Sequence, residues 1–361
     1  MTAEPLKEAI AAMEEGRVDF HNALLLYEQA DLLTLGQIAQ GIRFKKNPDP
    51  VVTYAVDRNI NYTNICVSRC SFCAFCRQKG DRDAYVLERS ALERKCRETL
   101  DLGGTHILYQ GGLNPDLNLA WHESRIRMMR GLGLHVHGFS PPEIVFMAEE
   151  AGLAIEGVIQ RLMTAGLGSI PGGGAEILVD RVREKISPGK ASTSQWLQVM
   201  RTAHHLGLKT TATMMFGHIE TAGERMAHLF AIRKLQEETG GFTAFIPWPY
   251  QPGGTSLTSR AVGGTTYLRM LAMSRIVLDN MGHIQASWVT QGHHIGQVAL
   301  HFGADDLGST MIEENVVASA GVHHTISRAE IIRLIETAGF SAVQRDTLYR
   351  PVTRNPEGGS Q

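Results

Sequence analysis

Four cysteines of this 361-residue chain, Cys66, Cys70, Cys73 and Cys76, lie within eleven positions in the stretch NYTNICVSRCSFCAFCRQKG. Thiolates this close together in a long chain indicate metal binding or redox chemistry, because a disulfide framework would spread them along a short secreted protein. Three frames compete. The first three cysteines read C-x3-C-x2-C, the last three read C-x2-C-x2-C, and the last two alone read C-x-x-C.

The second frame opens like a bacterial ferredoxin run but does not finish like one. That run continues with x3-C-P, where this chain has Gly80 and Asp81. A structural zinc site needs four ligands, and the fifth cysteine, Cys96, lies alone in the helical segment ERKCRETL. Zinc with histidine ligands and a redox dithiol stay open as alternatives to the first frame.

Two glycine-rich stretches follow predicted strands. Gly111 and Gly112 in ILYQGGLNP would let the backbone approach a ligand closely, although a tight turn explains them equally well. In SIPGGGAEILVD, three glycines precede Glu176. A phosphate loop would need Lys and Ser/Thr there, so we expect a nucleoside whose ribose hydroxyls donate to Glu176. The alternative is a surface turn with a solvated glutamate.

Histidines mark two further strand ends. His135 and His137 alternate in GLHVHGFSPPEI and therefore face one side of a strand, where an imidazole could bind substrate or simply pack in the core. Ser140 and Glu143 in the same stretch form a predicted capping box.

The stretches MMFGHIET and FIPWPYQPGGT supply the remaining candidates. His218 and Glu220 come just after one predicted strand, and Trp248, Tyr250 and Gln251 come just after the next. The aromatic residues would wall a pocket for a flat substrate, while the hydrogen-bonding tips would fix its orientation.

Short apolar runs that alternate with helical patterns predict the scaffold. The predicted strands are Asn59–Ile65, His106–Gln110, Leu134–Phe139, Ser169–Ile170, Lys209–Phe216, Phe242–Trp248 and His283–Val289, with a weak eighth near Asp305–Thr310. Such βα alternation predicts an α/β fold, a TIM-barrel-like (β/α)8 domain whose active site lies at the carboxyl ends of the strands. TSQWLQVMRTAHHLG and RAEIIRLIETAG read as outer helices with polar starts and Gly stops.

We expect three segments: an N-terminal helical cap (1–50), the barrel (51–350) and a disordered polar tail (351–361). Asp31 is a predicted helix N-cap within the first segment. A net charge of −2 offers no footprint for nucleic acid, and an acidic start without a long apolar run predicts a cytoplasmic protein without a membrane partner. A small molecule is the expected partner.

The first cysteine frame, with the aromatic Phe72 directly before its last member, resembles the radical S-adenosylmethionine (SAM) superfamily. The resemblance implies that Cys66, Cys70 and Cys73 bind a [4Fe-4S] cluster and leave one iron open to the amino and carboxylate groups of SAM. Cys76 would not bind iron, since a fourth thiolate would close that open position.

Further positions extend the resemblance. The GG pair is similar to the superfamily's GGE strand, whose backbone binds the methionine amino group, but Leu113 replaces the glutamate. The blocks QGGLNPDL, HVHGFSPPEI, IPGGGAEIL, PGKAS, GHIET, FIPWPYQP and STMIEENVVASAG resemble the cyclic dehypoxanthinylfutalosine synthase family from about residue 5 to about residue 350. Cys76 departs from the family pattern, where an aromatic or small polar residue is expected.

The family resemblance implies a radical cyclisation in the futalosine route to menaquinone. A 5′-deoxyadenosyl radical takes the ribose C4′ hydrogen, the carbon radical adds to the attached benzoate ring, and loss of an electron and a proton restores aromaticity. His137, His218 and Glu220 are the candidate bases.

The expected contacts and partners follow from the same reaction. Tyr62, Trp248, Tyr250 and Gln251 form the predicted contacts with the benzoate-bearing ribose substrate, and a flavodoxin or ferredoxin is the expected electron donor. The alternatives are an aminofutalosine synthase, a deazaflavin (F0) synthase subunit and a non-enzymatic zinc module.

Overall fold

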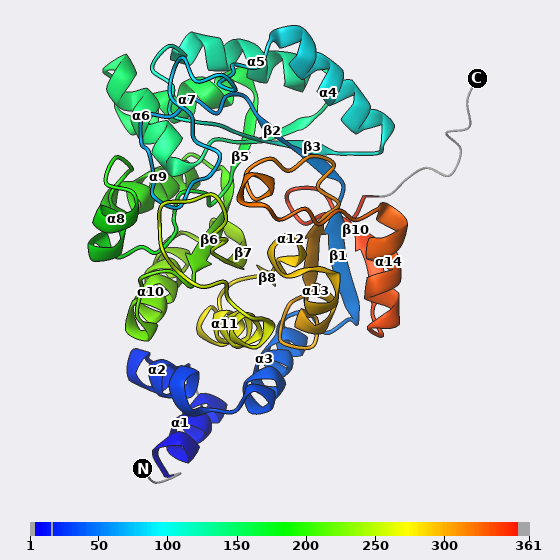
Figure 1. Cartoon of the computed structure of the whole chain (residues 1–361). Helices are drawn as coiled ribbons and strands as arrows, with labels where there is room; N and C mark the ends of the chain where they lie inside the picture. Colours follow the sequence, from blue (N-terminus) through cyan, green and yellow to red (C-terminus); the bar gives the residue numbers. More distant parts are fainter. Residues whose placement is uncertain (1–3, 16, 353–361) are drawn as a thin grey trace, which may run out of the picture.

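The computed structural model describes residues 4–15 and 17–352, whose strands form two parallel sheets that together curl into a barrel (Figure 1). The strands are β1 Val51–Ala55, β2 Asp57–Asn61, β3 His106–Gln110, β4 His135–Gly138, β5 Leu167–Ile170, β6 Lys209–Phe216, β7 Phe242–Pro249, β8 His283–Ile284, β9 Asp306–Ser309 and β10 Ser341–Gln344. The larger sheet has the order β2-β3-β4-β5-β6-β7-β8, and a smaller sheet has the order β10-β1-β9.

Backbone hydrogen bonds close the barrel between the two sheets. β1 and β2 are separated by one residue and follow each other directly. The Thr310 N–H donates to the Ala55 carbonyl (3.1 Å), and the Asn59 N–H donates to the Glu313 carbonyl (3.3 Å). The chain after β9 therefore lies beside β1 and β2, and a parallel bridge links β9 to the chain just after β8. The weak eighth strand predicted near Asp305–Thr310 is confirmed as β9.

Helices connect the strands, and most of them cover the outside of the barrel. They are α1 Glu4–Glu15, α2 Phe20–Gln29, α3 Leu32–Lys46, α4 Arg89–Asp101, α5 Leu119–Gly131, α6 Pro141–Ala151, α7 Ile155–Ala165, α8 Asp180–Ile186, α9 Thr193–His205, α10 Ala222–Thr239, α11 Gly264–Val277, α12 Trp288–Gln291, α13 His293–Ala299 and α14 Arg328–Thr337, with a 3₁₀ turn at Ala318–Ala320. The two outer helices expected from sequence are confirmed as α9 and α14. Capping boxes begin both helices, at Ser192 and at Ser327.

The N-terminal helices pack on the barrel, α2 against α10 and α3 against α11 (Figure 1). Asp31 caps α3 as predicted, since its carboxylate accepts from the Thr34 N–H (2.9 Å). Residues 1–50 were expected to form a cap of their own, and the contacts of α3 with the barrel suggest that this helix is part of the outer layer.

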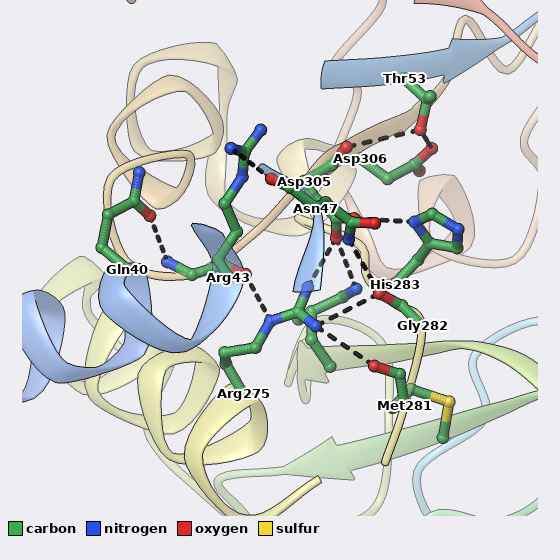
Figure 2. A network of polar contacts seen from close by, with 12 residues as sticks. Gln40, Arg43, Asn47, Thr53, Arg275, Met281, Gly282, His283, Asp305 and Asp306 are labelled. Atoms are coloured by element: carbon green, nitrogen blue, oxygen red, sulfur yellow. Dashed lines mark hydrogen bonds and ion pairs between the residues drawn. The ribbon is translucent and has the colours of Figure 1, made fainter. Parts of the chain in front are cut away.

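A buried polar network fixes the end of α3 to the barrel (Figure 2). Asn47 Nδ2 donates to Asp305 Oδ2 (2.7 Å), and Arg275 Nη2 donates to Asp305 Oδ1 (2.7 Å). His283 Nδ1 lies 2.7 Å from Asp305 Oδ2, and the Ile284 N–H donates to Oδ1 (2.9 Å). Burial alone would raise the pKa of Asp305, but Arg275 and His283 outweigh it and hold that pKa below its usual value.

Several predicted boundaries were wrong. The first barrel strand is Asp57–Asn61 and not Asn59–Ile65, because its inward residues are polar and hide the apolar pattern. β8 ends at Ile284, and α12 begins within the expected His283–Val289 strand. The predictions missed β1 and β10. Of the tail predicted as disordered, Pro351 bridges to Arg345 and residues 353–361 lie outside the described part of the chain.

Candidate active site

The cysteines of the first frame lie on the loop between β2 and α4, at the carboxyl end of the sheet. The Cys66 N–H donates to the Arg77 carbonyl (3.1 Å), and the Cys73 N–H donates to the Cys70 carbonyl (3.1 Å), so the loop folds back on itself. Cys70 is buried, whereas Cys66 and Cys73 are partly exposed. Barrel enzymes build their active sites at this edge of the sheet.

The pKa values of the four thiols in this loop are not all shifted in the same direction. A hydrogen bond from Cys76 lowers the pKa of Cys66 to about 5, and the same contact raises the pKa of Cys76. Burial raises the pKa of Cys70 and of Cys73, while the nearby ammonium of Lys190 opposes that shift. This contact therefore favours the charged form of Cys66 and the protonated form of Cys76.

A [4Fe-4S] cluster with three thiolate ligands fits this loop. The thiols of Cys66, Cys70 and Cys73 are near enough to affect one another's charge, and Lys190 offers a cation to balance the negative cluster. Within residues 4–15 and 17–352, no group of three or more His, Cys, Asp or Glu residues that could hold a metal ion is found. A cubane is wider than a single ion and holds its ligands farther apart, so this finding does not bear on a cluster.

The glycine pair after β3 packs directly under the cysteine loop. A side chain at Gly112 would lie 2.1 Å from the Ile65 carbonyl oxygen, and one at Gly111 would lie 2.7 Å from the Tyr62 ring. The Gly111 N–H donates to Glu143 Oε1 (3.0 Å), which also accepts from the Tyr62 hydroxyl (2.7 Å). Glycine is therefore required here for close packing. The predicted capping box at Glu143 is confirmed, and the same carboxylate also holds the glycine loop.

Glu176 connects the glycine-rich loop after β5 to the cysteines. Its Oε1 accepts from Lys190 Nζ (2.9 Å), and Lys190 Nζ also lies 5.1 Å from the centre of the Phe72 ring. Burial would lower the pKa of Lys190, but Cys70 and Glu176 outweigh it and raise that pKa. Glu176 Oε2 is buried and has no hydrogen-bond partner among the described residues, and Arg183 Nη1 lies 3.9 Å from it.

A cavity of about 290 Å³ lies inside the barrel, below this loop. Small-ligand pockets begin at about this volume. Trp248 from β7 and Trp288 from α12 line it, with His137 from β4 and Gln110 from β3. Burial, followed by the nearby His106, His135 and Arg345, lowers the pKa of His137 well below its usual value, so its imidazole is neutral. The site thus combines a flat apolar wall with an uncharged imidazole.

Other candidates from the sequence lie outside this lining. The His218 side chain is fully buried, 3.1 Å from Glu220, and Glu220 also pairs with Arg225 (2.7 Å). Tyr250 is buried, and its hydroxyl donates to the Leu257 carbonyl (2.8 Å). These contacts hold the loops after β6 and β7 and leave these side chains no access to the cavity.

The side chains of Tyr62 and Gln251 are likewise engaged in contacts within the protein. Tyr62 is 2% exposed and packs against Tyr109 and Phe139. Gln251 Nε2 donates to the Pro249 carbonyl (3.0 Å). Among the predicted substrate contacts, Trp248 is the one that lines the cavity.

The cavity also contains polar residues that the sequence analysis missed. Asp57 Oδ2 lies 2.9 Å from His106 Nε2, and Asp57 Oδ1 accepts from Ser309. Arg345 binds Asp306 through two nitrogens, and its guanidinium lies 4.0 Å from the centre of the Tyr349 ring. The alternation of Asp57 and Asn59 in β2 was the available signal, since inward positions of a strand repeat every second residue.

Arg345, Thr347 and Tyr349 follow β10 and line the cavity from the C-terminal end of the chain. No motif in the sequence marked this segment as part of the site. It reaches the barrel because β10 pairs with β1, and that pairing joins residues almost 300 positions apart.

A second hollow of about 520 Å³ lies on the other side of the cysteine loop. Its charged residues are paired with each other, Arg77 with Asp83 (2.7 Å) and Lys95 with Glu313 (2.5 Å). The barrel cavity is therefore the better candidate for substrate binding.

Comparison with known proteins identifies the family. The sequence matches the family described as Radical SAM superfamily over residues 60–232 and the CofH/MqnC C-terminal region over residues 239–357. The FeFe-hydrogenase maturase HydG from Carboxydothermus hydrogenoformans has the same fold, with a TM-score of 0.75, 15% identity, and coverage of 96% of this chain and 81% of that chain. Methylornithine synthase gives a TM-score of 0.73 at 15% identity and covers 92% of this chain and 96% of that chain.

Curated relatives are much closer in sequence. Cyclic dehypoxanthine futalosine synthase from Streptomyces coelicolor is 43% identical, with 96% of this chain and 88% of the relative covered. Its counterpart from Halalkalibacterium halodurans is 41% identical, with 94% of this chain and 92% of the relative covered. The 5-amino-6-(D-ribitylamino)uracil–L-tyrosine 4-hydroxyphenyl transferase of Archaeoglobus fulgidus is 43% identical, with 82% of this chain and 88% of the relative covered. The chain belongs to the radical SAM superfamily and, within it, to the cyclic dehypoxanthine futalosine synthase family.

Proposed function

We propose that this enzyme converts dehypoxanthine futalosine into its cyclic form in the futalosine route to menaquinone. The observation that carries the proposal is the 43% and 41% identity to two synthases of that name over nearly the whole chain. A [4Fe-4S] cluster with SAM supplies a 5′-deoxyadenosyl radical in this superfamily. Hydrogen abstraction at ribose C4′, ring closure onto the benzoate, and loss of one electron and one proton complete the reaction.

The protein's part in this reaction is to bind and position. We assign Cys66, Cys70 and Cys73 as the cluster ligands, with Lys190 as the cation that balances their charge. We assign Glu176 Oε2 as an acceptor for the ribose of SAM, since it is a buried oxygen without a hydrogen-bond partner in the described residues. The main contribution of the protein is to hold the reacting carbon beside the radical source. Binding in a fixed orientation lowers the entropic cost of reaching the transition state.

The substrate lies in the barrel cavity in this proposal. Its benzoate ring packs against Trp248, and His137 takes the proton that leaves the ring. The imidazole is neutral and lines the cavity, which are the two requirements for a general base at this place. His218 and Glu220 are weaker candidates for that role because their side chains are fully buried and paired.

Other members of the wider family define the second candidate. The 43% identity to a 4-hydroxyphenyl transferase favours a reaction between a ribitylaminouracil and tyrosine. The deazaflavin (F0) synthase subunit predicted from the sequence falls under this second candidate. No relative named above supports an aminofutalosine synthase.

Anaerobic turnover of reconstituted protein with SAM and a reductant separates the two candidates. With dehypoxanthine futalosine, we expect 5′-deoxyadenosine together with a product lighter than the substrate by two hydrogens. Consumption of tyrosine and 5-amino-6-(D-ribitylamino)uracil in its place would assign the transferase. Deoxyadenosine without loss of either substrate would show that the radical chemistry is right and the substrate wrong.

The electron that begins the reaction must come from outside the chain. We infer a small one-electron carrier of the flavodoxin or ferredoxin kind. Turnover with reduced flavodoxin or ferredoxin, but not with NADPH alone, tests this inference. In the described residues, no helix is both long enough and apolar enough to cross a bilayer.

A further inference from the structure

Two histidines and a serine form a continuous line of hydrogen-bonding atoms at the wall of the barrel. His137 Nδ1 lies 2.6 Å from Ser169 Oγ, and His135 Nε2 lies 2.7 Å from the same oxygen. His135 and His137 both point inward from β4, and Ser169 is the residue of β5 that pairs in register with His137. One hydroxyl therefore bridges two imidazole rings.

The single hydroxyl proton links the protonation states of the two rings. If His137 Nδ1–H donates to Ser169 Oγ, the Ser169 O–H is available to donate to His135 Nε2. That arrangement leaves a lone pair on His137 Nε2 and a proton on His135 Nδ1. Shifting every proton by one position gives the opposite arrangement, with a proton on His137 Nε2.

The two ends of this line face different surroundings. His137 lines the cavity, and no described residue hydrogen bonds to its Nε2. His135 is partly exposed and does not line the cavity, and no described residue hydrogen bonds to its Nδ1. The charged groups from outside the sheet that act on His135 are Asp346 and Arg350 of the C-terminal segment and Arg130 of α5. One end of the line is at the substrate and the other faces away from it.

We propose that His137, Ser169 and His135 form a proton relay that carries the proton of the rearomatised ring out of the closed barrel. The relay rests on the proposed function. The C–H bond of the cyclised ring breaks, its proton goes to His137 Nε2, and the Nδ1 proton passes through Ser169 to His135 Nε2. The His135 Nδ1 proton then leaves to solvent, and the electron passes to a one-electron acceptor of the iron–sulfur or flavin class.

Gly168 lies against the His135 ring, at the outer end of the relay. A side chain at Gly168 would lie 2.4 Å from Cε1 and 2.7 Å from Nδ1 of His135. Its backbone is not in the left-handed region, so the need for glycine comes from the imidazole that fills this space. The position therefore offers a way to displace His135 without removing any hydrogen-bonding group.

The test uses three variants of the full-length enzyme. Ser169→Ala removes the bridge, Gly168→Ala pushes His135 away from it, and Thr210→Val is the matched control. Thr210 Oγ1 lies 2.7 Å from His204 Nε2, which is the same kind of contact, but neither residue lines the cavity. In a single anaerobic turnover, we expect the first two variants to form 5′-deoxyadenosine within about twofold of the wild type. Their cyclised product per deoxyadenosine should fall by about tenfold or more, while an organic radical accumulates in the EPR spectrum.

An unchanged product ratio in both Ser169→Ala and Gly168→Ala would overturn the relay. Histidine ¹⁵N NMR of the protein without cofactor gives a readout that is independent of substrate identity. We expect His137 to carry its proton on Nδ1 and His135 on Nδ1, and Ser169→Ala to change the populations of both tautomers while Thr210→Val changes neither. Protons on both nitrogens that face Ser169 would make the serine an acceptor only and would contradict the relay, whether or not the proposed substrate turns over.

Discussion

Two buried polar networks in this protein differ in how completely they are satisfied. Both oxygens of Asp305 accept from protein donors, which come from α3, α11 and β8 (Figure 2). The line from His137 to His135 has a protein partner in its middle and none among the described residues at its ends. A saturated network stabilises one arrangement of the chain, whereas a network with unpaired ends can exchange protons or bind a ligand. The cysteine loop is of the second kind.

Loss of a cluster ligand should have the largest effect. We expect Cys70→Ala to abolish iron binding and deoxyadenosine formation, because three thiolates are the minimum that this loop supplies to the cluster. Iron content and the visible spectrum after anaerobic reconstitution measure the effect. Cys96→Ala is the matched control, since this thiol is buried in α4, and it should keep its iron. Full iron content in Cys70→Ala would remove Cys70 from the ligand set.

Opening the saturated network should instead affect folding. Arg275→Met leaves the Asp305 carboxylate buried without its main counter-charge, so we expect the free energy of unfolding to fall by about 3–5 kcal/mol. Urea denaturation of the apoprotein measures it. Arg181→Met, which opens an exposed pair with Glu224, should change stability by less than about 1 kcal/mol. Equal losses in the two variants would show that burial is not what distinguishes the Asp305 network.

Variants of the two candidate bases should differ in which property they lose, catalytic yield or stability. His137→Gln should lower cyclised product by about a hundredfold, the usual size of a general-base contribution, with iron content unchanged. His218→Gln should lower stability and leave the yield of product per deoxyadenosine intact, since His218 is buried beside Glu220. The opposite pattern would move the base to the loop after β6.

Acid should remove the stability that the buried, paired carboxylates contribute. The pKa values of Asp305 and Asp57 are lowered in the folded protein, although burial opposes the shift, because Arg275 and His106 respectively stand beside them. Their contribution to stability is therefore complete above the unfolded carboxyl pKa of about 3.9 and is lost as pH falls through the lower folded values. Urea midpoints measured from pH 7 to pH 3 should fall at the acid end, more weakly in Asp305→Asn. Midpoints that rise on acidification would contradict this account.

The smallest effect is expected at Cys76. Its thiol donates to Cys66 without being needed as a ligand, so Cys76→Ala should keep its iron and most of its activity. Iron content is again the measurement. Loss of the cluster in this variant, with retention in Cys66→Ala, would exchange the two assignments.

The sequence predicted the barrel and the place of the cysteines well, because those features depend on local patterns. β3 and β6 match their predicted bounds, since each contains a short continuous run of apolar or β-branched residues. β2 was displaced because Asp57 and Asn59 point into the cavity and interrupt such a run.

The substrate side of the site was harder to predict. A position after a strand places a residue at the correct edge of the barrel but does not tell whether its side chain is already used. Tyr250 and His218 are such cases, since Leu257 and Met215 respectively hold them through carbonyl contacts. Lys190 lies in the block PGKAS, but that block gave it no role, because its contacts with the cysteines join positions about 120 residues apart.

Deuterium transfer tests the central claim most directly. Dehypoxanthine futalosine labelled with deuterium at ribose C4′ should give 5′-deoxyadenosine that carries one deuterium, together with cyclised product that has lost it. Unlabelled 5′-deoxyadenosine formed alongside cyclised product would contradict hydrogen abstraction at C4′ and with it the mechanism proposed for this barrel.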